Sequence, residues 1–451
     1  MNKTNLIYGV KDKAPFWKNL LFACQQFLAI IAATILVPIL VNGQSGKDLL
    51  NPASALVGAG VGTLVYLLLT KFKSPVFLGS SFAFIYPLST AAAFGYFGIF
   101  FGALVAGGIY ALLALIIKLF GTNWIEKLMP PIIIGPTVAL IGLSLAGSAM
   151  DNVMNIAVSV ANYNLIYIIV GLFTFFVTII VSVKGCKQIR VFPFVIGVLS
   201  GYALACIFTI IGRVADVAYL QIVDFSAFNT ITDFSTWIPN LTFVGLFKEG
   251  FANVNGTAIA SVAIGFAPVA FVVFAEHIAD HKNISSIIGE DLLTDPGLHR
   301  TLLGDGIGSI AGSFFGGCPN TTYGESVGCV AITGCASVRT IFTAAIICIV
   351  VAFFGPAMAL VTSISSCEAI VGGISIALYG FIAVSGLRMF KHIDLDDSRN
   401  LFVVSSILIT GIGGLYFQFG PIAINSVAPA LIVGILVNLV LKPSKKEEKK
   451  D

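Results

Sequence analysis

The stretch Gly256–Ala275, GTAIASVAIGFAPVAFVVFA, contains no charged residue and is followed directly by Glu276. About 20 apolar residues are enough for a helix to cross a bilayer, so this stretch predicts a transmembrane helix. An ionised carboxylate at the centre of a membrane costs roughly 2.5–3.5 kcal/mol on insertion scales, and such an acid usually faces a pathway, a ligand or a proton. Glu276 is therefore a candidate functional residue. The alternative is that the span ends one turn earlier and Glu276 is a solvated cap, because His277, Asp280 and His281 follow closely.

The composition of the whole chain indicates the same environment. Of its 451 residues, 57% are apolar and only 10% are charged, whereas a soluble domain carries about 25% charged residues. We therefore expect an all-α polytopic membrane protein. Residues 1–15 are polar and basic, without the apolar core of a signal peptide, so we interpret them as a cytoplasmic tail. The eight cysteines are scattered without a C-x-x-C pair, which argues against a disulfide framework and a zinc site; we expect no metal and no cofactor.

Apolar runs and basic loops together predict about fourteen spans. Short cytoplasmic loops collect Lys and Arg, and with fourteen spans only Lys47, Arg213 and Lys248 of the 25 basic residues fall on the outer face. Both termini are then cytoplasmic, the protein lies in the plasma membrane, and the net charge of +3 needs no nucleic-acid partner. The expected spans are 17–42, 52–70, 75–93, 96–120, 128–148, 164–183, 191–212, 256–280, 301–316, 319–337, 341–363, 368–387, 401–418 and 421–441.

Two pairs of similar segments indicate that the chain is built twice. Leu78–Phe82 (LGSSF) resembles Pro319–Tyr323 (PNTTY), and Phe192–Gly197 (FPFVIG) resembles Ala428–Gly434 (APALIVG). Seven spans per repeat is an odd number, so the two halves must enter the membrane in opposite directions, as in the inverted repeats of secondary transporters. We therefore expect two seven-span repeats, residues 16–213 and 256–442, separated by an extracytoplasmic connection, 214–255, and followed by a charged cytoplasmic tail, 443–451.

Polar and glycine-rich residues interrupt the third and tenth spans at matching positions. Around Phe77–Ser81 and Gly316–Gly328, Gly, Ser, Thr, Asn and Pro stand where apolar helix would otherwise continue. Non-helical backbone is tolerated at membrane depth only where it is buried in protein or lines a cavity, and paired breaks are typical of the binding sites of transporters. We expect short extended segments in these two spans, with Glu325 beside the second. The alternative is a solvated loop at 316–328 with Glu325 as a surface acid.

Five runs of sequence resemble one known family. They are Gln25–Pro38, Phe77–Pro87, Ala275–His281 (AEHIADH), Asp291–Gly316 and Cys318–Gly334 (CPNTTYGESVGCVAITG). Together they are similar to the nucleobase/ascorbate transporter family, and most similar to its bacterial uracil permeases. The resemblance implies fourteen helices in two inverted repeats, with a core domain of spans 1–4 and 8–11 and a gate domain of spans 5–7 and 12–14. It also implies a homodimer in the lipid bilayer that imports a nucleobase with a proton by an elevator-like, alternating-access movement.

The same resemblance implies the residues of the binding site. Glu276 and Glu325 would be the carboxylates that bind the base, and Phe82 and Gly324 would offer backbone groups beside them. Uracil is a small planar amide with alternating N–H donors and C=O acceptors, which suits two carboxyl groups and two backbone amides. A buried carboxyl group can also hold and release a proton near neutral pH.

The proton-handling residues and the choice of base depend on departures from the uracil-permease pattern. Asp280 stands where uracil permeases carry His, one helical turn after Glu276, and Asp280 and Asp305 resemble the xanthine-type branch. We expect Asp280, Asp305 and Ser81 to support Glu276 and Glu325 in handling the proton. The expected substrate is uracil, and the alternative is xanthine or another purine.

Two other functional classes fit the sequence less well. A membrane enzyme that handles lipid-linked phosphates would need an Asp-rich metal motif or a His/Ser constellation. Asp394, Asp396 and Asp397 have no matching second acidic cluster, and we interpret them as part of a solvated loop. A channel would line a continuous pore with rings of like residues. We therefore expect a transporter and no catalytic residue.

Overall fold

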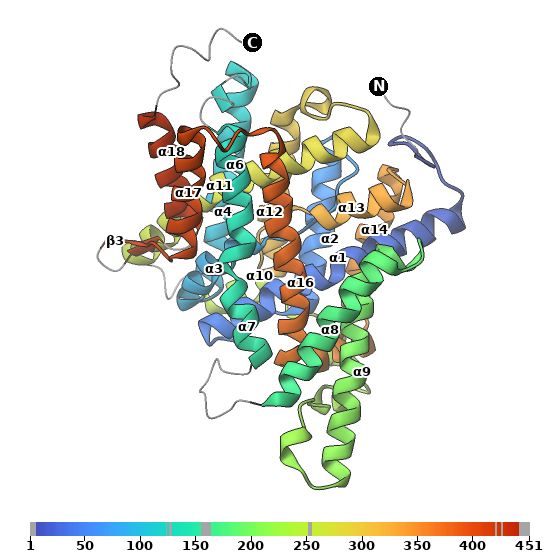
Figure 1. Ribbon diagram of the computed structural model, residues 1–451. Helices are drawn as coiled ribbons and strands as arrows, with labels where there is room; N and C mark the ends of the chain where they lie inside the picture. Colours follow the sequence, from blue (N-terminus) through green and yellow to red (C-terminus); the bar gives the residue numbers. More distant parts are fainter. Residues whose placement is uncertain are drawn as a thin grey trace.

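The computed structural model describes residues 6–122, 124–125, 129–154, 164–250, 255–419, 422–424 and 427–441. Residues 1–5 of the expected N-terminal tail, the whole expected tail 443–451 and residues 251–254 of the connection lie outside the described residues. Most of the described chain is helical (Figure 1). The helices are α1 (Phe16–Ser45), α2 (Pro52–Leu69), α3 (Ile85–Ala91), α4 (Gly95–Phe120), α6 (Pro131–Ser144), α7 (Ala146–Met154), α8 (Leu165–Lys184), α9 (Pro193–Val214), α10 (Thr242–Glu249), α11 (Gly256–Ile288), α12 (Leu298–Gly316), α13 (Gly324–Thr333), α14 (Val338–Ala352), α15 (Gly355–Ser365), α16 (Glu368–Leu387), α17 (Ser398–Ile412) and α18 (Val427–Val440). The strands are β1 (Leu78–Ser80), β2 (Asn320–Thr322), β3 (Phe417–Phe419) and β4 (Ile422–Ile424).

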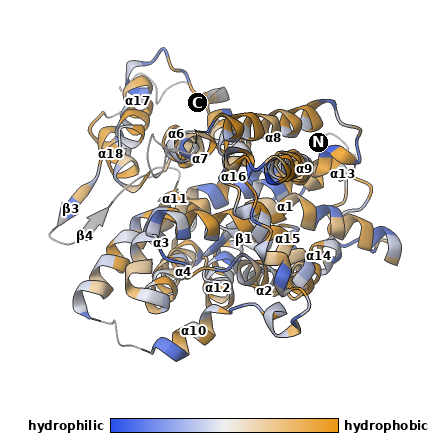
Figure 2. Cartoon of the chain, turned by 90° about the horizontal axis from the view of Figure 1, so that it is seen from below, coloured by the Kyte–Doolittle hydropathy of each residue, from blue (hydrophilic) through white to orange (hydrophobic). Residues whose placement is uncertain are grey.

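The structure confirms an all-α membrane protein with several spans. Within the described residues, eight helical stretches are long and apolar enough to cross a membrane, and they contain α1, α2, α4, α6, α8, α9, α11 and α16. Figure 2 shows that apolar residues predominate along these helices. The most apolar stretches of α8 and α9 are only 22% buried inside the protein, which suits helices that face lipid. The helices α12, α13, α17 and α18 are shorter or less apolar and lie at four of the other expected spans.

The expected span 341–363 is bent in the middle. The helix α14 ends at Ala352, α15 begins at Gly355, and the two are bent by 81°. Pro356 lies in the first turn of α15, where the missing proline N–H needs no partner, so this residue favours the start of a new helix after the bend. Trp237 packs against the bend so closely that a Cβ atom on Gly355 would overlap the indole ring.

The helices pack into two groups (Figure 2). In the first group, α12 contacts α2, α4 and α10, α11 contacts α3, α4 and α13, and α14 contacts α1 and α2. In the second group, α16 contacts α6, α7, α8 and α9, and α17 contacts α6 and α18. Contacts of α11 with α6 and α18, and of α1 with α9, join the groups. Segments from both halves of the sequence therefore contribute to each group.

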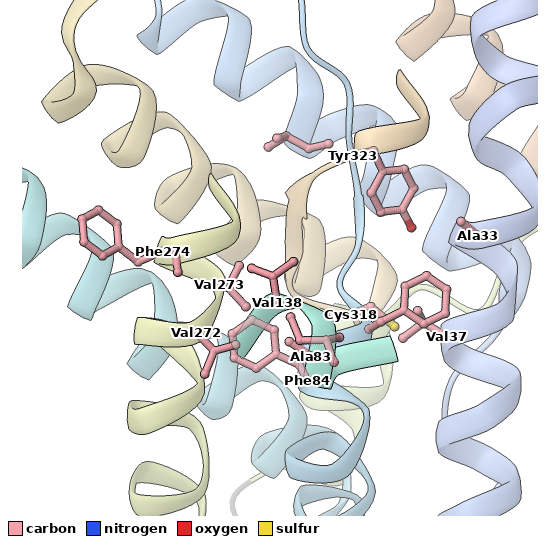
Figure 3. Packing of buried hydrophobic residues seen from close by; sticks show 14 of the residues in the cluster. Ala33, Val37, Ala83, Phe84, Val138, Val272, Val273, Phe274, Cys318 and Tyr323 are labelled. Carbon is pink, nitrogen blue, oxygen red and sulfur yellow. The ribbon is translucent and has the colours of Figure 1, made fainter. Parts of the chain in front are cut away.

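Buried apolar side chains fill the boundary between the two groups. Figure 3 shows Ala83 and Phe84 beside Val272 and Val273 of α11, close to Val138 of α6. All five residues are less than 9% exposed. This packing fixes the position of the middle of α11, which carries the acidic residues of the AEHIADH run.

Glycine residues allow α2 and α12 to approach closely. A Cβ atom on Gly58 of α2 would overlap the carbonyl oxygen of Gly312, and one on Gly62 would lie 2.7 Å from the carbonyl oxygen of Gly308. Small residues four positions apart let helix backbones meet in a membrane, where van der Waals packing replaces the hydrophobic effect as the driving force. This packing explains why α12 is largely buried although it is less apolar than the other spans.

The expected extended segments in spans 3 and 10 are present as β1 and β2. These strands form an antiparallel pair in which Gly79 lies opposite Thr321, and the backbone N–H of Ser81 extends the pair by donating to Pro319 O at 3.0 Å. Each strand thereby supplies backbone partners that an interrupted helix loses inside a membrane. The predicted loop alternative at 316–328 is wrong, because this stretch contains buried β2 and most of the first two turns of α13.

The two strands bring the beginnings of two short helical segments together. The 3-10 turn η1 (Phe82–Phe84) and α3 follow β1, and α13 follows β2. Since the strands are antiparallel, the helical segments leave the crossing in opposite directions, and their N-terminal ends meet near it. Close contact of Gly79 with Tyr323 holds this arrangement: a Cβ atom on Gly79 would overlap the Tyr323 ring, whose hydroxyl donates to Ser80 O at 2.8 Å.

Candidate functional site

A cavity lies where the strand crossing faces the second group of helices. One side is formed by the middle of α11, the start of η1 and the start of α13, and the other side by α6 and α16. The lining residues are Phe82, Val138, Glu276, Ala279, Asp280, Thr321, Tyr323, Gly324, Glu325, Phe381, Ile382 and Ser385.

The cavity brings together five of the residues proposed from the sequence. Phe82, Glu276, Asp280, Gly324 and Glu325 all line it. They come from three elements that are up to about 240 residues apart in the chain, and only the crossing of β1 and β2 makes them neighbours.

Two other proposed residues, Ser81 and Asp305, lie outside the cavity lining. The Ser81 side chain is fully buried, and its hydroxyl has no hydrogen-bond partner among the described residues. Asp305 lies on α12 and is fully buried. Neither side chain is therefore placed to touch a molecule in the cavity directly.

The helix α11 presents two acids to the cavity. It runs without interruption from Gly256 to Ile288, so Glu276 lies twelve residues before its end, and the alternative of a solvated helix cap is wrong. Asp280 follows one turn later on the same face, as residues four apart do in a helix. The Thr322 hydroxyl of β2 donates to Asp280 Oδ2 at 2.9 Å and fixes this carboxyl group at the edge of the cavity.

The start of α13 presents the third acid. Gly324 is the first residue of this helix and Glu325 lies in its first turn, where the unpaired backbone N–H groups and the helix dipole favour negative charge. A Cβ atom on Gly324 would lie 3.8 Å from both Asp280 Oδ1 and Phe381 Cε1. The backbone of Gly324 thus faces the cavity without a side chain in between.

The residue after Glu325 ties three elements together. The Ser326 hydroxyl accepts a hydrogen bond from the backbone N–H of Phe77 at 3.1 Å and another from the Gln26 side chain of α1. The Phe82 ring contacts the Tyr379 ring of α16 edge-on, at 5.9 Å between centroids, and thereby joins this cavity residue to α16. Local sequence offers no reason to select Gln26 or Tyr379, because both contacts depend on distant segments.

The cavity continues into a vestibule of about 1010 Å³. Asp280, Gly324 and Phe381 line both spaces, and Lys282 and Arg388 line the vestibule. Basic residues mark the cytoplasmic side under the positive-inside rule. The geometry therefore connects the cavity with the face that the sequence predicts to be cytoplasmic.

A buried polar cluster lies behind Glu276, and of its members Asp305 was selected from the sequence but His277, His281 and Tyr66 were not. His277 Nδ1 lies 2.8 Å from Asp305 Oδ2, and both side chains are fully buried. His281 Nε2 lies 2.7 Å from the Tyr66 hydroxyl, and the two imidazole rings stack at 4.0 Å between centroids. The available signal was the spacing of the two histidines, which are four residues apart inside an apolar helix.

One ion pair lies on the surface at the connection between α11 and α12. Lys73 Nζ lies 2.5 Å from Asp295 Oδ1. The hydrogen bond and positive charge of Lys73 lower the pKa of Asp295 below its usual value. The pair joins the α2–β1 connection to the α11–α12 connection on the side of the basic loops.

Comparisons with known proteins agree with this architecture. The model of the Permease family matches residues 17–418. A Uracil permease from Bacillus subtilis (strain 168) is 37% identical over 460 residues, covering 100% of this chain and 98% of the relative. A Uracil permease from Escherichia coli (strain K12) is 34% identical over 441 residues, covering 97% of this chain and 95% of the relative.

Solved structures of other transporters share the fold at low sequence identity. The murine Solute Carrier 26 family member A9 anion transporter, in the inward-facing state, matches with a TM-score of 0.65 and 12% identity over 96% of this chain and 69% of that chain. The transmembrane domain of the cyanobacterial bicarbonate transporter BicA matches with a TM-score of 0.62 and 14% identity, covering 95% of this chain and 99% of that domain. At such identities the likeness concerns the fold alone.

Proposed function

The chain belongs to the Permease family, and from this premise we propose that it imports uracil together with a proton. Relatives named Uracil permease match nearly its full length, so transport of a small molecule follows from the family and an enzymatic activity does not.

The chemical groups that line the cavity favour a nucleobase as the substrate. Two carboxyl groups, Glu276 and Glu325, and the backbone at Phe82 and Gly324 border one space. Carboxylates accept hydrogen bonds from ring N–H groups, and backbone N–H groups at a helix start donate to ring carbonyls. Uracil carries both kinds of group on one edge. The Phe82 ring offers an aromatic surface for a planar base.

The crowding of acids supports the coupling to protons. Glu276, Asp280 and Glu325 border the same cavity, and no Lys or Arg lines it within the described residues. Carboxylates that share a poorly solvated site cannot all be ionised without a large energetic cost, so at least one takes up a proton. We propose that Glu276 and Asp280 exchange this proton as the base binds and leaves.

The two groups of helices support an alternating-access movement. We propose that they correspond to a core domain (α1–α4 and α11–α14) and a gate domain (α6–α9 and α16–α18) of a fourteen-span protein with two inverted repeats and both termini in the cytoplasm. The cavity lies between the groups, so a shift of one group along the other would move its opening from the vestibule to the opposite face. A homodimer in the plasma membrane would hold the gate domain still during this shift.

Asp280 favours a second candidate substrate, xanthine. It lies at the cavity edge, where Thr322 holds it, and the resemblance to uracil permeases implies a histidine at this position in that branch. An additional acceptor at this position suits the larger hydrogen-bonding edge of a purine. The names of the full-length relatives favour uracil.

Uptake into proteoliposomes tests the proposal. The purified protein is reconstituted, and entry of radiolabelled uracil is followed with and without an inward proton gradient. We expect accumulation that needs the gradient and that a protonophore abolishes. Uptake that ignores the protonophore would contradict proton coupling. Strong competition by unlabelled xanthine with weak competition by uracil would reverse the choice of base.

A further inference from the structure

The N-terminal segment, residues 6–12, is hydrogen-bonded to the far end of α13. The backbone N–H groups of Ile7 and Tyr8 donate to the carbonyl oxygen of Gly334 at 2.7 and 3.1 Å. Gly334 directly follows the last residue of α13 and caps this helix in the left-handed conformation, with φ at 70°. The sequence predicted the segment only as part of a cytoplasmic tail. In the structure its backbone caps a helix that begins at the cavity.

The pairing continues past the end of α13 to the start of α14. The backbone N–H of Ala336 donates to Tyr8 O at 2.9 Å, and that of Val338 donates to Val10 O at 3.1 Å. Tyr8 and Cys335 form a parallel bridge. Val10 and Cys335 are each only 4% exposed. The segment is therefore packed into the protein, and Figure 1 shows the blue beginning of the chain beside α13 and α14.

The helix α1 holds the other end of α13. Its Gln26 side chain donates to the hydroxyl of Ser326, which lies in the first turn of α13 directly after Glu325. The Tyr8 ring contacts the Phe22 ring of α1 edge-on, at 6.0 Å between centroids, and so links the N-terminal segment to the same helix. The N-terminal segment and α1 together therefore hold α13 at both of its ends.

The shortness of α13 makes its position depend on these contacts. The helix has ten residues, and helices shorter than about 12–15 residues are marginal without tertiary contacts. At a rise of about 1.5 Å per residue, its capped end lies about 15 Å along the helix from Gly324 at the cavity. Backbone hydrogen bonds join the successive turns, so a shift at one end is carried to the other. A displacement of Gly334 would therefore move the Gly324 backbone and the Glu325 carboxyl group.

We propose that residues 6–12 are a positioning segment for substrate binding, whose backbone bonds to Gly334 fix α13 so that Gly324 and Glu325 face the bound base. This inference rests on the proposed binding of a nucleobase in the cavity. No residue of the segment is among the described residues that line the cavity or the vestibule, so the segment acts through α13 and does not touch the substrate. A base that needs the positioned helix also stabilises the pairing, because coupling between two sites is reciprocal.

Backbone groups carry the pairing, so a proline is the suitable change. Tyr8→Pro removes an N–H that donates to Gly334 O, because proline has no N–H. Tyr8→Ala removes the ring contact with Phe22 and retains the backbone donors. Lys13→Pro is the matched control, because Lys13 is exposed and its N–H makes no hydrogen bond within the part of the chain that the structure describes.

Equilibrium binding of labelled uracil to the purified variants tests the positioning role. We expect Tyr8→Pro to weaken the affinity about 5- to 150-fold, the usual range of coupling between two sites. Tyr8→Ala should weaken it less, and Lys13→Pro should bind normally. Reaction of Cys335 with a thiol reagent, located by mass spectrometry, reports whether the segment has detached, because Cys335 is buried and pairs with Tyr8. Where Tyr8→Pro leaves Cys335 protected, deletion of residues 2–10 detaches the segment.

Two results of this comparison would overturn the inference. One is wild-type affinity in a protein whose Cys335 has become reactive. The other is a lowered melting temperature of Tyr8→Pro without base, together with unchanged affinity of the folded protein, because a segment that only stabilises the fold gives this result. We expect the affinity to fall even at temperatures at which the variant is fully folded.

The reciprocal effect is measured on the wild-type protein and needs no variant to fold. Saturating uracil should slow the reaction of Cys335 by the same factor by which detachment weakens the affinity. Cys186 is exposed and serves as the internal control, whose reaction should not change. Equal reaction of Cys335 with and without uracil would overturn the inference.

The outcomes separate this inference from the proposed function. Absence of nucleobase binding by the wild-type protein would contradict the proposed function. Normal binding by the wild type that is indifferent to detachment of the segment would contradict only this inference. If xanthine binds in place of uracil, the same measurements are made with xanthine and decide the inference in the same way.

Discussion

Replacing Gly324 with valine tests whether the substrate binds in the cavity beside β2 and the start of α13. A Cβ atom at this position would lie 3.8 Å from Asp280 Oδ1 and 3.8 Å from Phe381 Cε1, which is ordinary van der Waals contact. The fold therefore has room for the first added carbon. The two methyl groups of valine extend beyond it into the space between the acids and α16.

The expected effect on binding is large and the effect on folding is small. Extra methyl groups in a well-packed site cost typically about 1–3 kcal/mol. If the base fills this space, that cost falls on the complex and weakens the affinity about 5- to 150-fold, because about 1.4 kcal/mol changes Kd tenfold. Valine is a somewhat better helix former than glycine, so the start of α13 should remain intact.

Equilibrium binding of labelled uracil to the purified variant, together with its melting temperature, measures both effects. Gly328→Ala is the matched control, since it lies one turn further along α13 and a Cβ atom there would meet no atom within 4 Å. We expect wild-type affinity in the control. Wild-type affinity in Gly324→Val would show that the base does not bind at this break, and the assignment of Phe82, Glu276 and Glu325 to the substrate would fail with it.

Four further changes test other parts of the structure. Glu276→Gln should abolish uracil binding without lowering the melting temperature, because a neutral amide adds no insertion cost; near-normal uptake would make this acid structural. Asp280→His should retain uracil uptake and weaken competition by xanthine, and unchanged competition would exclude Asp280 from base selection. Gly79→Ala should lower the free energy of unfolding by about 1–3 kcal/mol, because the new methyl group overlaps a buried aromatic ring; an unaltered denaturation midpoint would contradict the tight crossing of the strands. Lys73 lowers the pKa of Asp295 in the folded state, so the Lys73–Asp295 pair stabilises the folded protein above the unfolded-state pKa of about 4. This stabilisation is lost as the pH falls through the folded-state pKa of Asp295. The melting temperatures of Asp295→Asn and wild type should therefore differ slightly at pH 7 and converge in acid.

The amino-acid sequence was sufficient to predict the features that follow from the cost of placing polar groups inside a membrane. An acid inside a membrane span is costly, and this cost distinguishes Glu276 and the other acids within the expected spans from the acids of the loops. Glycine and polar residues at matching places in spans 3 and 10 cannot continue a lipid-facing helix. Their positions therefore predicted the extended segments that β1 and β2 form. These arguments need only local sequence and the cost of unpaired polar groups, and they also placed Glu325 at the site.

Features that depend on tertiary contacts could not be predicted in the same way. His277 and Asp305 are 28 residues apart, and only the packing of α11 against α12 shows that they pair. Without that contact, the sequence predicted Asp305 only as a residue that supports the proton-handling acids and gave no indication of its partner. The bend before α15 was missed for a different reason: an apolar run of sufficient length concealed Gly355 and Pro356, and hydropathy does not register the missing N–H of a proline.

The strand crossing also forms one side of the cavity. Breaking a helix inside a membrane leaves backbone N–H groups without partners, and each unpaired group costs several kcal/mol there. At the crossing, β1 and β2 satisfy most of these groups through each other, and the remaining ones lie at the beginnings of η1 and α13, where they border the cavity. A ligand with carbonyl acceptors would satisfy them in turn. The residues that pair the two strands therefore also determine which backbone groups remain for the substrate, and a change in the crossing should alter binding even where it touches no residue of the cavity.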